Sequence, residues 1–243
     1  MQFRPADFAR VTSHGYALAD AIADRGECAQ LATAITRYAE EHPLPLIERE
    51  CGGRDLRYSV IDGEAIAASF PIIASLYDEM RDALSVATGR EVVPLAAARA
   101  AMNVNLTAPG GEYRWHYDRN ALTAIVYLTA VEGGDIELHP RYRLLLGRLR
   151  HSRLQRFVDR VLQLPLARAL AGKPVVVAPA AGRIVAMSGD RCLHSVRCVE
   201  RGTRIALVFA YDYAGAKTAA AAELDRYLYT REATARRDPN YAG

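Results

Sequence analysis

The sequence predicts an α+β fold, in which a largely helical N-terminal part precedes a sandwich or barrel of short β-strands. Three observations lead to this prediction. Apolar residues recur at helical spacing through much of the first 90 residues, the pattern changes to short apolar runs from about Val92, and glycine- or proline-containing turns separate several of those runs. The chain contains no internal repeat.

Two helical segments are expected in the N-terminal part. Residues 29–38 alternate small or apolar with polar side chains at helical spacing, and a longer segment runs from about Gly63 to Thr88. The expected buried stripe of the longer segment is Ile72, Ile73, Leu76, Met80 and Leu84. Pro71 should break that segment or start part of it, because proline lacks a backbone N–H. Residues 56–61 between the two segments fit a strand.

The remaining strands are expected after Val92. They are residues 100–106, 122–129, 135–138, 175–178, 183–187 and 203–211. Turns at residues 109–111, 133–134 and 179–182 separate several of them. A last helix is expected over residues 216–229, followed by a polar tail.

Residues 140–174 interrupt the strand region with an amphipathic helix. Its apolar positions are Leu154, Phe157, Val158, Val161 and Leu162, and its polar positions are Arg153, Arg156, Asp159, Arg160 and Gln163. Residues 141–172 hold eight arginines and a single acid, which gives +7 within a chain of net charge +3. The rest of the chain therefore carries −4.

Composition excludes several classes of protein. With 51% hydrophobic and 24% charged residues, the chain of 243 residues has a globular rather than a disordered composition. No apolar run approaches the ~18 residues of a membrane helix, and we expect no secretory signal. Cys28, Cys51, Cys192 and Cys198 form neither a disulfide framework nor a C-x-x-C zinc motif. A reduced, cytoplasmic setting without membrane association is expected.

His116 and Asp118 form an H-x-D motif. On an extended strand, side chains two residues apart project to one face, so that both can bind one ion. With six histidines in the chain, such a pair arises by chance in about one chain in three, so the motif alone is weak evidence.

The order of features around this motif is more specific. An apolar strand follows it at residues 124–129, then the turn at residues 133–134, a second turn at residues 179–182, His194, and Arg204 ten residues later. This order resembles that of the Fe(II)/2-oxoglutarate-dependent oxygenases, particularly their prolyl-hydroxylase-like branch, over about residues 100–213 without the insert. The resemblance implies a double-stranded β-helix (jelly-roll) core with supporting N-terminal helices and a helical insert between strands.

The chain is accordingly expected to be a single oxygenase domain over residues 1–243. Its expected parts are a mainly helical support (1–91), the jelly-roll core (92–213) with the basic insert (140–174), and a C-terminal helix and tail (214–243).

The resemblance assigns the iron ligands to His116, Asp118 and His194. Two imidazoles and one carboxylate on one face of an octahedral ion form the facial triad of non-haem iron, which leaves positions open for a bidentate 2-oxo acid and dioxygen. The histidines outside this set are expected to be surface or structural residues. They are His14, His42, His139 and His151.

For the cosubstrate, the resemblance implies that Arg204 pairs with the C5 carboxylate of 2-oxoglutarate, to which its planar guanidinium is suited. The family often has Ser or Thr two residues later, whereas this chain has Ala206. Tyr127 is the candidate for the missing hydroxyl, with a core tyrosine as the alternative. Asn105 is a further candidate cosubstrate contact.

Four residues are candidates for the primary substrate: Asn103, Tyr113, Trp115 and Arg119. Asn103 shares strand parity with Asn105 and is expected to line the same cavity. Trp115 has strand parity opposite to His116 and has core packing as its alternative. Arg119 could pair with a carboxylate of the substrate or, alternatively, with a nearby acidic residue of the chain.

The function implied by the resemblance is hydroxylation of an unactivated C–H bond with release of succinate and CO₂. The cofactors would be Fe(II), 2-oxoglutarate and O₂, with ascorbate as a candidate requirement. Asp118 favours hydroxylation over halogenation, because related halogenases lack this carboxylate. Desaturation, epoxidation and cyclisation remain open alternatives. A small molecule of biosynthesis, an amino acid or natural-product intermediate, is the expected substrate.

Two other functions remain as alternatives: a peptidyl or protein side-chain (prolyl-type) hydroxylase, and a cupin-like metal-binding jelly roll without oxygenase activity. The basic insert has three interpretations. It is a helical elaboration whose apolar face covers the sheet, a lid over the barrel mouth, or a docking surface for an acidic partner such as a carrier protein. Nucleic acid is not expected, since no aromatic platform accompanies the arginines.

Overall fold

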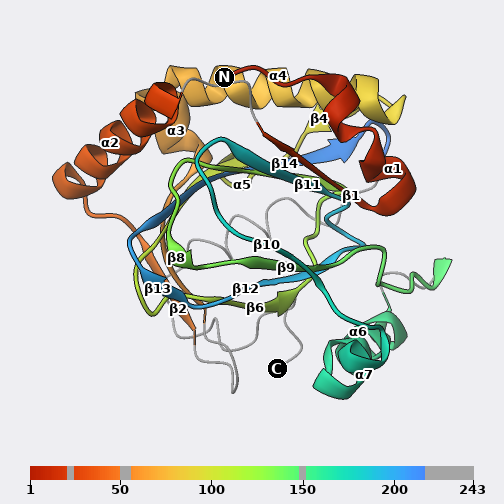
Figure 1. The fold of residues 1–243 in the computed structure, drawn as a ribbon. Helices are drawn as coiled ribbons and strands as arrows, with labels where there is room; N and C mark the ends of the chain where they lie inside the picture. The colour runs from red at the N-terminus through yellow and green to blue at the C-terminus, as the bar shows by residue number, and fades with distance from the viewer. Residues whose placement is uncertain (21–24, 50–55, 148–151, 217–243) are drawn as a thin grey trace.

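The computed structural model describes residues 1–20, 25–49, 56–147 and 152–216, and its core consists of two antiparallel β-sheets that face each other (Figure 1). The major sheet has the strand order β1-β11-β7-β14-β5-β3-β2, and β4 also pairs with β14. Its strands are β1 (Tyr16–Asp20), β2 (Leu46–Arg49), β3 (Leu56–Ile61), β4 (Val92–Pro94), β5 (Met102–Thr107), β7 (Leu122–Tyr127), β11 (Arg183–Met187) and β14 (Arg204–Tyr213).

The minor sheet has the order β10-β9-β12-β6, and a separate ribbon joins β13 to β8. These strands are β6 (Tyr113–His116), β8 (Glu132–Gly133), β9 (Ile136–His139), β10 (Val175–Val177), β12 (Leu193–Val196) and β13 (Val199–Arg201). The predicted fold class is confirmed, since a sheet-rich core follows a helix-rich N-terminal part and adopts the double-stranded β-helix arrangement.

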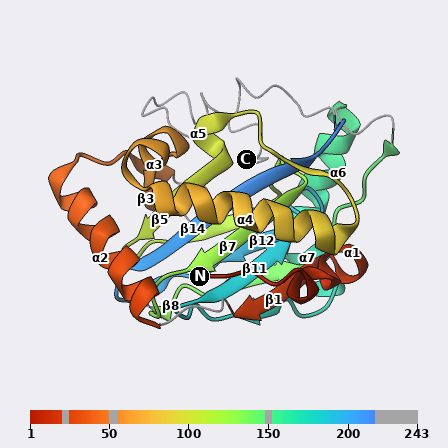
Figure 2. The same cartoon turned by 90° about the horizontal axis from the view of Figure 1, so that it is seen from above.

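Helices cover the outer face of the major sheet (Figure 2). The helices within the described residues are η1 (Pro5–Phe8), α1 (Arg10–His14), α2 (Arg25–Glu41), α3 (Gly63–Ser69), α4 (Pro71–Thr88), α5 (Ala98–Ala101), α6 (Arg153–Gln163) and α7 (Pro165–Leu170). Pro71 starts α4, as expected, and most of the predicted stripe of α4 is buried. Ile72 is the exception, with 59% of its surface exposed. A rotation of about 100° separates it from Ile73, which takes the buried position.

Two separate cores result from this layering. One lies between the helices and the major sheet, and the other lies between the two sheets. Every residue of β7 is buried, and its side chains alternate: Ala124 and Val126 join the helical core, whereas Ile125 and Tyr127 point between the sheets. A continuous apolar run is therefore the sequence pattern of a strand that is covered on both faces.

The strands differ from their predicted bounds mostly at their ends. Residues 100 and 101 belong to α5, so that β5 begins at Met102 rather than Ala100. The first 91 residues contribute β1, β2 and β3 to the major sheet as well as helices. The helix predicted over residues 216–229 lies outside the described residues except for Ala216. None of the helices in the described ranges is long and apolar enough to span a bilayer.

The predicted helix of the insert forms, but its orientation is the reverse of one expectation. Helix α6 buries Gln155 and Asp159, whereas Leu154, Phe157 and Val161 are 52%, 62% and 41% exposed. The interpretation in which the apolar face covers the sheet is therefore wrong. Helices α6 and α7 stand at a corner of the molecule beside the minor sheet (Figure 1).

The physical reason is a polar seam between α6 and the segment before it. Arg143 donates two hydrogen bonds to the carboxylate of Asp159, at 2.9 and 2.6 Å. The side chain of Gln155 accepts from the backbone N–H of Leu146 and donates to the carbonyl of Leu144, at 2.8 and 2.9 Å. Because backbone groups of this loop need partners, α6 must present its polar side to them.

Removing the carboxylate of the seam should loosen α6. In Asp159→Ala, the guanidinium of Arg143 loses its charged partner, which we expect to cost about 1–3 kcal/mol in local stability. Hydrogen exchange of the α6 amides should therefore accelerate. Arg160→Ala on the exposed side of the same helix is the control. Equal exchange in the two variants would show that the seam does not hold the helix.

Candidate active site

His116, Asp118 and His194 come together at the edge of the minor sheet. His116 ends β6 and lies directly opposite His194 of β12 in the strand register. The distance from Asp118 Oδ1 to His116 Nε2 is 3.7 Å, and that to His194 Nε2 is 3.5 Å. One donor atom from each residue lies within 4.8 Å of the others. The three predicted ligands thus form one cluster.

Backbone hydrogen bonds fix both imidazole rings. His116 Nδ1 lies 2.8 Å from the carbonyl of Arg114, and His194 Nδ1 lies 3.1 Å from the carbonyl of Cys192. A carbonyl only accepts, so each Nδ1 carries a proton, and each Nε2 faces Asp118 as the nitrogen through which the ring could bind a metal ion. Burial and the neighbouring His194 lower the pKa of His116 below its usual value, which keeps this ring neutral.

The carboxylate of Asp118 is held by a short chain of hydrogen bonds. Thr123 donates to Asp118 Oδ2 at 2.5 Å, and Asn120 Nδ2 donates to Thr123 Oγ1 at 2.9 Å. The backbone N–H of Asp118 donates to the carbonyl of Gly189. Oδ2 of Asp118 therefore accepts the hydrogen bond from Thr123, whereas Oδ1 faces the two histidines.

Gly189 makes this arrangement possible because no side chain fits there. A Cβ at this position would lie 2.7 Å from the Asn120 carbonyl, 2.8 Å from Thr123 Oγ1 and 3.0 Å from Asp118 Cβ. All three contacts are closer than ordinary packing allows.

The donor set fits a divalent metal ion. Two neutral imidazole nitrogens and one carboxylate oxygen are the donors of a facial triad with open positions, the arrangement of non-haem iron. Ligand atoms about 2.1 Å from one ion at right angles stand about 3 Å apart. The observed separations of 3.5 and 3.7 Å require a contraction of only a few tenths of an ångström.

An irregularity in the pairing of β6 with β12 brings a further residue to the same side. His194 pairs with His116 and Val196 with Tyr113, so two steps on β12 match three steps on β6. Such a bulge re-aims side chains. Tyr113 consequently packs between the sheets, stacked on Tyr58 at 4.8 Å, although strict alternation would place it opposite to His116.

Arg204 lies between the sheets with only 2% of its surface exposed. Its Nη2 donates to the Tyr127 hydroxyl at 3.4 Å, and its guanidinium lies 4.9 Å from the Tyr127 ring centroid and 5.9 Å from that of Tyr113. Among the described residues no acid pairs with it, and its Nε is buried without a partner, as is Asn105 Oδ1. A buried cation without a counter-charge is costly, so this site suits an anionic ligand.

Strand register explains why the chain can have Ala206 where the family often has Ser or Thr. Ala206 is fully buried and lies opposite both Tyr127 of β7 and Asn105 of β5. Its small side chain stands between these two polar residues, and the Tyr127 hydroxyl reaches Arg204. Tyr127 thus stands where the substitute hydroxyl was expected.

The four candidates for the primary substrate lie in different places. Tyr113 lies between the sheets, with its ring centroid 5.9 Å from the guanidinium of Arg204. Trp115 packs against His139, at 5.3 Å between ring centroids, and under the guanidinium of Arg168 of α7, at 4.5 Å. Arg119 is half-buried in the bend after Asp118, and Asn103 is half-buried on β5, where its amide donates to the Ala100 carbonyl.

Sequence reasoning missed two hydroxyls of the site. Thr107 is buried, pairs with Arg204 in the strand register and lies 3.5 Å from the Tyr113 hydroxyl. Thr123 positions Asp118. Thr123 is a polar residue in a mostly apolar strand, which is a signal, whereas Thr107 follows two asparagines on β5. Only the sheet pairing tells which face and which partner each threonine has.

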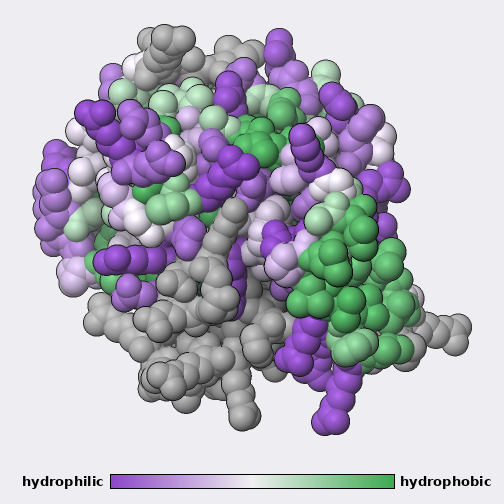
Figure 3. Space-filling model, turned by 60° about the horizontal axis from the view of Figure 1, so that its bottom comes forward, coloured by the Kyte–Doolittle hydropathy of each residue, from purple (hydrophilic) through white to green (hydrophobic). Residues whose placement is uncertain are grey.

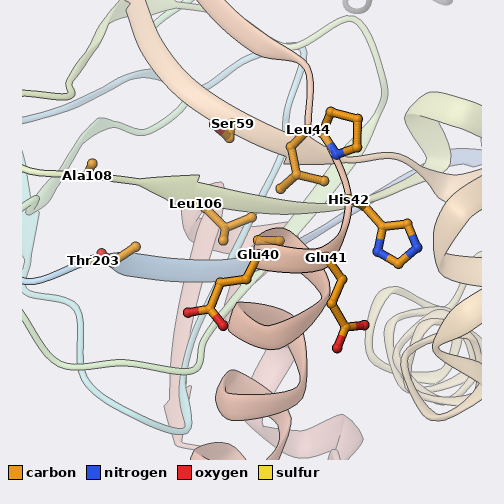
Figure 4. A pocket seen from close by; sticks show the side chains of 10 residues that line it. Glu40, Glu41, His42, Leu44, Ser59, Leu106, Ala108 and Thr203 are labelled. Carbon is orange, nitrogen blue, oxygen red and sulfur yellow. The ribbon is translucent and has the colours of Figure 1, made fainter.

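A cavity of about 520 Å³ lies elsewhere, between the end of α2 and the outer face of β3 and β5 (Figure 4). Its lining includes Glu40, His42, Ser59, Leu106 and Thr203. It shares no residue with the His–Asp–His cluster or with the surroundings of Arg204.

Comparisons with known proteins agree with this geometry. Residues 102–212 match the model of the 2OG-Fe(II) oxygenase superfamily. Among solved structures, a Pseudomonas putida prolyl-4-hydroxylase is 18% identical, with 87% of this chain and 99% of that chain covered and a TM-score of 0.57. AviO1 from Streptomyces viridochromogenes Tue57 is 21% identical, with coverages of 90% and 99% and a TM-score of 0.62.

The non-heme alpha-ketoglutarate-dependent carbocyclase SnoK from nogalamycin biosynthesis is also similar, at 15% identity, coverages of 87% and 86%, and a TM-score of 0.66. These likenesses concern the fold. No curated protein sequence matches the chain.

The hydrogen bond from Thr123 should matter for metal binding. Thr123→Val removes the donor to Asp118 Oδ2, and we expect it to weaken metal affinity about tenfold, as loss of an outer hydrogen bond to a ligand does. Anaerobic titration with Fe(II) or Co(II) measures the change. Thr33→Val, which removes a hydroxyl bonded only to the Ala29 carbonyl of α2, is the control. An unchanged affinity in Thr123→Val would contradict the positioning role.

Proposed function

The chain belongs to the 2OG-Fe(II) oxygenase superfamily, and from this premise we propose that it hydroxylates an unactivated C–H bond of a small molecule. Members of this superfamily use Fe(II), 2-oxoglutarate and O₂, which confirms the expected family and cofactors. In the proposed reaction one oxygen atom of O₂ enters the succinate formed from 2-oxoglutarate and the other enters the product hydroxyl, and CO₂ is released.

We propose His116, Asp118 and His194 as the iron ligands. Bound Fe(II) would supply the activation of dioxygen that couples decarboxylation of 2-oxoglutarate to oxidation of the substrate. The protein's part is to present two neutral Nε2 lone pairs and Asp118 Oδ1 to one point. The hydrogen bonds at His116 Nδ1 and His194 Nδ1, with that of Thr123 to Asp118, keep these donors in place before the ion arrives.

Arg204 is proposed to bind the C5 carboxylate of 2-oxoglutarate. The observation that carries the proposal is the combination of two sites in one inter-sheet core: a His–Asp–His cluster and a buried guanidinium without an acidic partner among the described residues. A carboxylate there would neutralise the guanidinium and accept hydrogen bonds from it and from the Tyr127 hydroxyl. Asn105 is proposed to contribute its unpaired, buried Oδ1 through a bridging water or ligand hydroxyl.

A small molecule, such as an amino acid or natural-product intermediate, is the proposed primary substrate. Two arginines outside the barrel, Arg143 and Arg168, lie over Tyr117 and Trp115, which alternate with the proposed ligands. Because Arg143 is paired with Asp159, these contacts place ordered aromatic and cationic side chains beside the proposed ligands but select no charge for the substrate. The similar solved structures include an epimerase and a carbocyclase from nogalamycin biosynthesis, which act within small-molecule biosynthesis.

Peptidyl hydroxylation is the second candidate. The specific observation in its favour is the likeness to a prolyl-4-hydroxylase of which this chain covers 99%. An assay with ¹⁸O₂ separates hydroxylation, of a small molecule or of a peptide, from epimerisation and ring closure. Hydroxylation places one labelled atom in the product, whereas epimerisation or ring closure leaves the product unlabelled and would contradict the proposed reaction.

Oxygenase chemistry is tested by an anaerobic titration of the purified protein with Fe(II) and 2-oxoglutarate. We expect the weak visible charge-transfer band of a 2-oxo acid chelated to Fe(II), and its loss in Asp118→Ala. Asp135→Ala, at a partly buried acid in an ion pair with Arg197, is the control and should retain the band. Tight zinc binding without any such band would instead favour a cupin-like metal protein.

The role of Arg204 predicts a specific kinetic change. Arg204→Ala should raise the concentration of 2-oxoglutarate needed for half-saturation about 100-fold, because it removes a buried, charge-assisted pair that contributes about 3 kcal/mol. The same titration, read from the charge-transfer band, measures it without a primary substrate. Arg201→Ala at an exposed arginine of β13 is the matched control. An unchanged requirement in Arg204→Ala would refute the assignment.

A further inference from the structure

The outward side of α6 and α7 is an exposed apolar surface (Figure 3). Six side chains, here called the α6–α7 face, form it: Leu154, Phe157, Val161, Leu164, Leu166 and Leu170. The most exposed are Leu166 at 74% and Leu170 at 82%. Contiguous apolar surface of this kind on a folded protein marks a site of interaction.

The polar seam keeps this face outward. Rotating α6 to bury Phe157 would break the hydrogen bonds of Asp159 with Arg143 and those of Gln155 with the backbone of Leu144 and Leu146. The apolar side chains therefore remain available to an occupant from outside the described fold.

The charges beside the face indicate an anionic occupant. Arg153, Arg156 and Arg160 are exposed and, at about 100° per residue, lie within a sector of about 60° next to the apolar side chains. The single acid of α6 and α7, Asp159, is buried against Arg143. A second copy of the chain docked face to face would bring these arginines against their equivalents, which disfavours a dimer.

The chemistry of the face favours lipid over protein. Aliphatic side chains dominate it, and they lie on two helices that stand out from the body (Figures 1 and 3). The binding energy of protein interfaces is concentrated in Trp, Tyr and Arg, with Leu and Val under-represented. A helix with a Leu/Phe face beside a row of arginines is instead the pattern of helices that lie in the headgroup region of a membrane.

We infer that the α6–α7 face docks the protein on a lipid surface rich in anionic headgroups, which differs from the expectation of no membrane association drawn from the sequence. Phe157 and the leucines enter the boundary between headgroups and acyl chains, and the arginines of α6 reach the lipid phosphates. Because Arg168 of α7 lies over Trp115, next to His116, docking brings the proposed iron site close to the membrane. The inference is independent of the proposed reaction, since binding to vesicles requires neither iron nor 2-oxoglutarate.

Co-sedimentation of the full chain with large unilamellar vesicles tests this. Vesicles of phosphatidylcholine alone are compared with vesicles that contain about 30% phosphatidylglycerol, at salt concentrations of about 50 and about 500 mM. We expect at least tenfold tighter binding to the anionic vesicles, weakened by salt. Equal binding to the two compositions, or none to either, overturns the inference.

Matched variants locate the contact. Phe157→Glu should reduce binding to anionic vesicles at least tenfold, whereas Ile72→Glu, at a side chain of similar exposure on α4, should leave it unchanged. Replacing Arg153, Arg156 and Arg160 together by Gln should abolish the preference for phosphatidylglycerol. A circular dichroism spectrum and a thermal midpoint like those of the unaltered protein show that Phe157→Glu is folded. Equal loss in Ile72→Glu contradicts the inference.

Two other occupants would give different results. A concentration-dependent dimer that Phe157→Glu abolishes, without vesicle binding, would identify a second copy and overturn the lipid assignment. Binding of a purified acidic acyl carrier protein in place of vesicles would also overturn the lipid assignment and would favour the interpretation of the insert as a docking surface for an acidic partner.

Discussion

The structure depends most on one constraint, the antiparallel register of β14 between β5 and β7. This register sets Arg204 opposite Thr107 and Ala206 opposite both Asn105 and Tyr127. Since strand side chains alternate between faces, a slip by one residue would turn Arg204 toward the helical core and replace it with an aliphatic neighbour. The same register aligns the apolar residues of β14 and β7 with α4, so the helical layer opposes any slip. Packing on one face of the sheet thus fixes the polar pocket on the other.

The His–Asp–His cluster depends on two local departures from regular structure. The bulge between β6 and β12 brings His116 and Tyr113 to one side, although they are three residues apart. After His116, the chain leaves the strand, and Asp118 is fixed by Thr123 and by the carbonyl of Gly189, where no side chain has room. Regular sheet pairing supplies the long-range alignment of His116 with His194, and irregular backbone supplies the final direction of the carboxylate. Both are needed to point three donor atoms at one place.

Part of the fold and of the candidate site could be predicted from the sequence. Helical periodicity and apolar runs predicted α2, α6 and strands such as β3, β7 and β11 within a few residues, but not β6 and β12, which carry His116 and His194. The cluster that the fold assembles was implied by the resemblance to the oxygenase family. The roles of Thr107 and Thr123 could not be predicted, because the hydrogen-bond partner of a strand threonine is unknown until the sheet register is known. The position of Tyr113 between the sheets could not be predicted either, because strict alternation does not anticipate the bulge between β6 and β12. For α6, periodicity established that two faces exist, but not which of them the body of the protein would cover.

The orientation of α6 can be understood by comparing the free energy of burying its apolar face with that of burying its polar face. Burying Leu154, Phe157 and Val161 would contribute about 1.5–3 kcal/mol for each side chain. It would also leave the guanidinium of Arg143, the carboxylate of Asp159 and the backbone of Leu144 and Leu146 without their partners, and each such group costs about 1–3 kcal/mol, more when charged. The two totals are of similar size, and the structure has the orientation that keeps the hydrogen bonds of the polar seam. Arg143 also lies over the ring of Tyr117, between His116 and Asp118. A change that disturbs the seam should therefore reach the proposed iron ligands through the same arginine that holds α6.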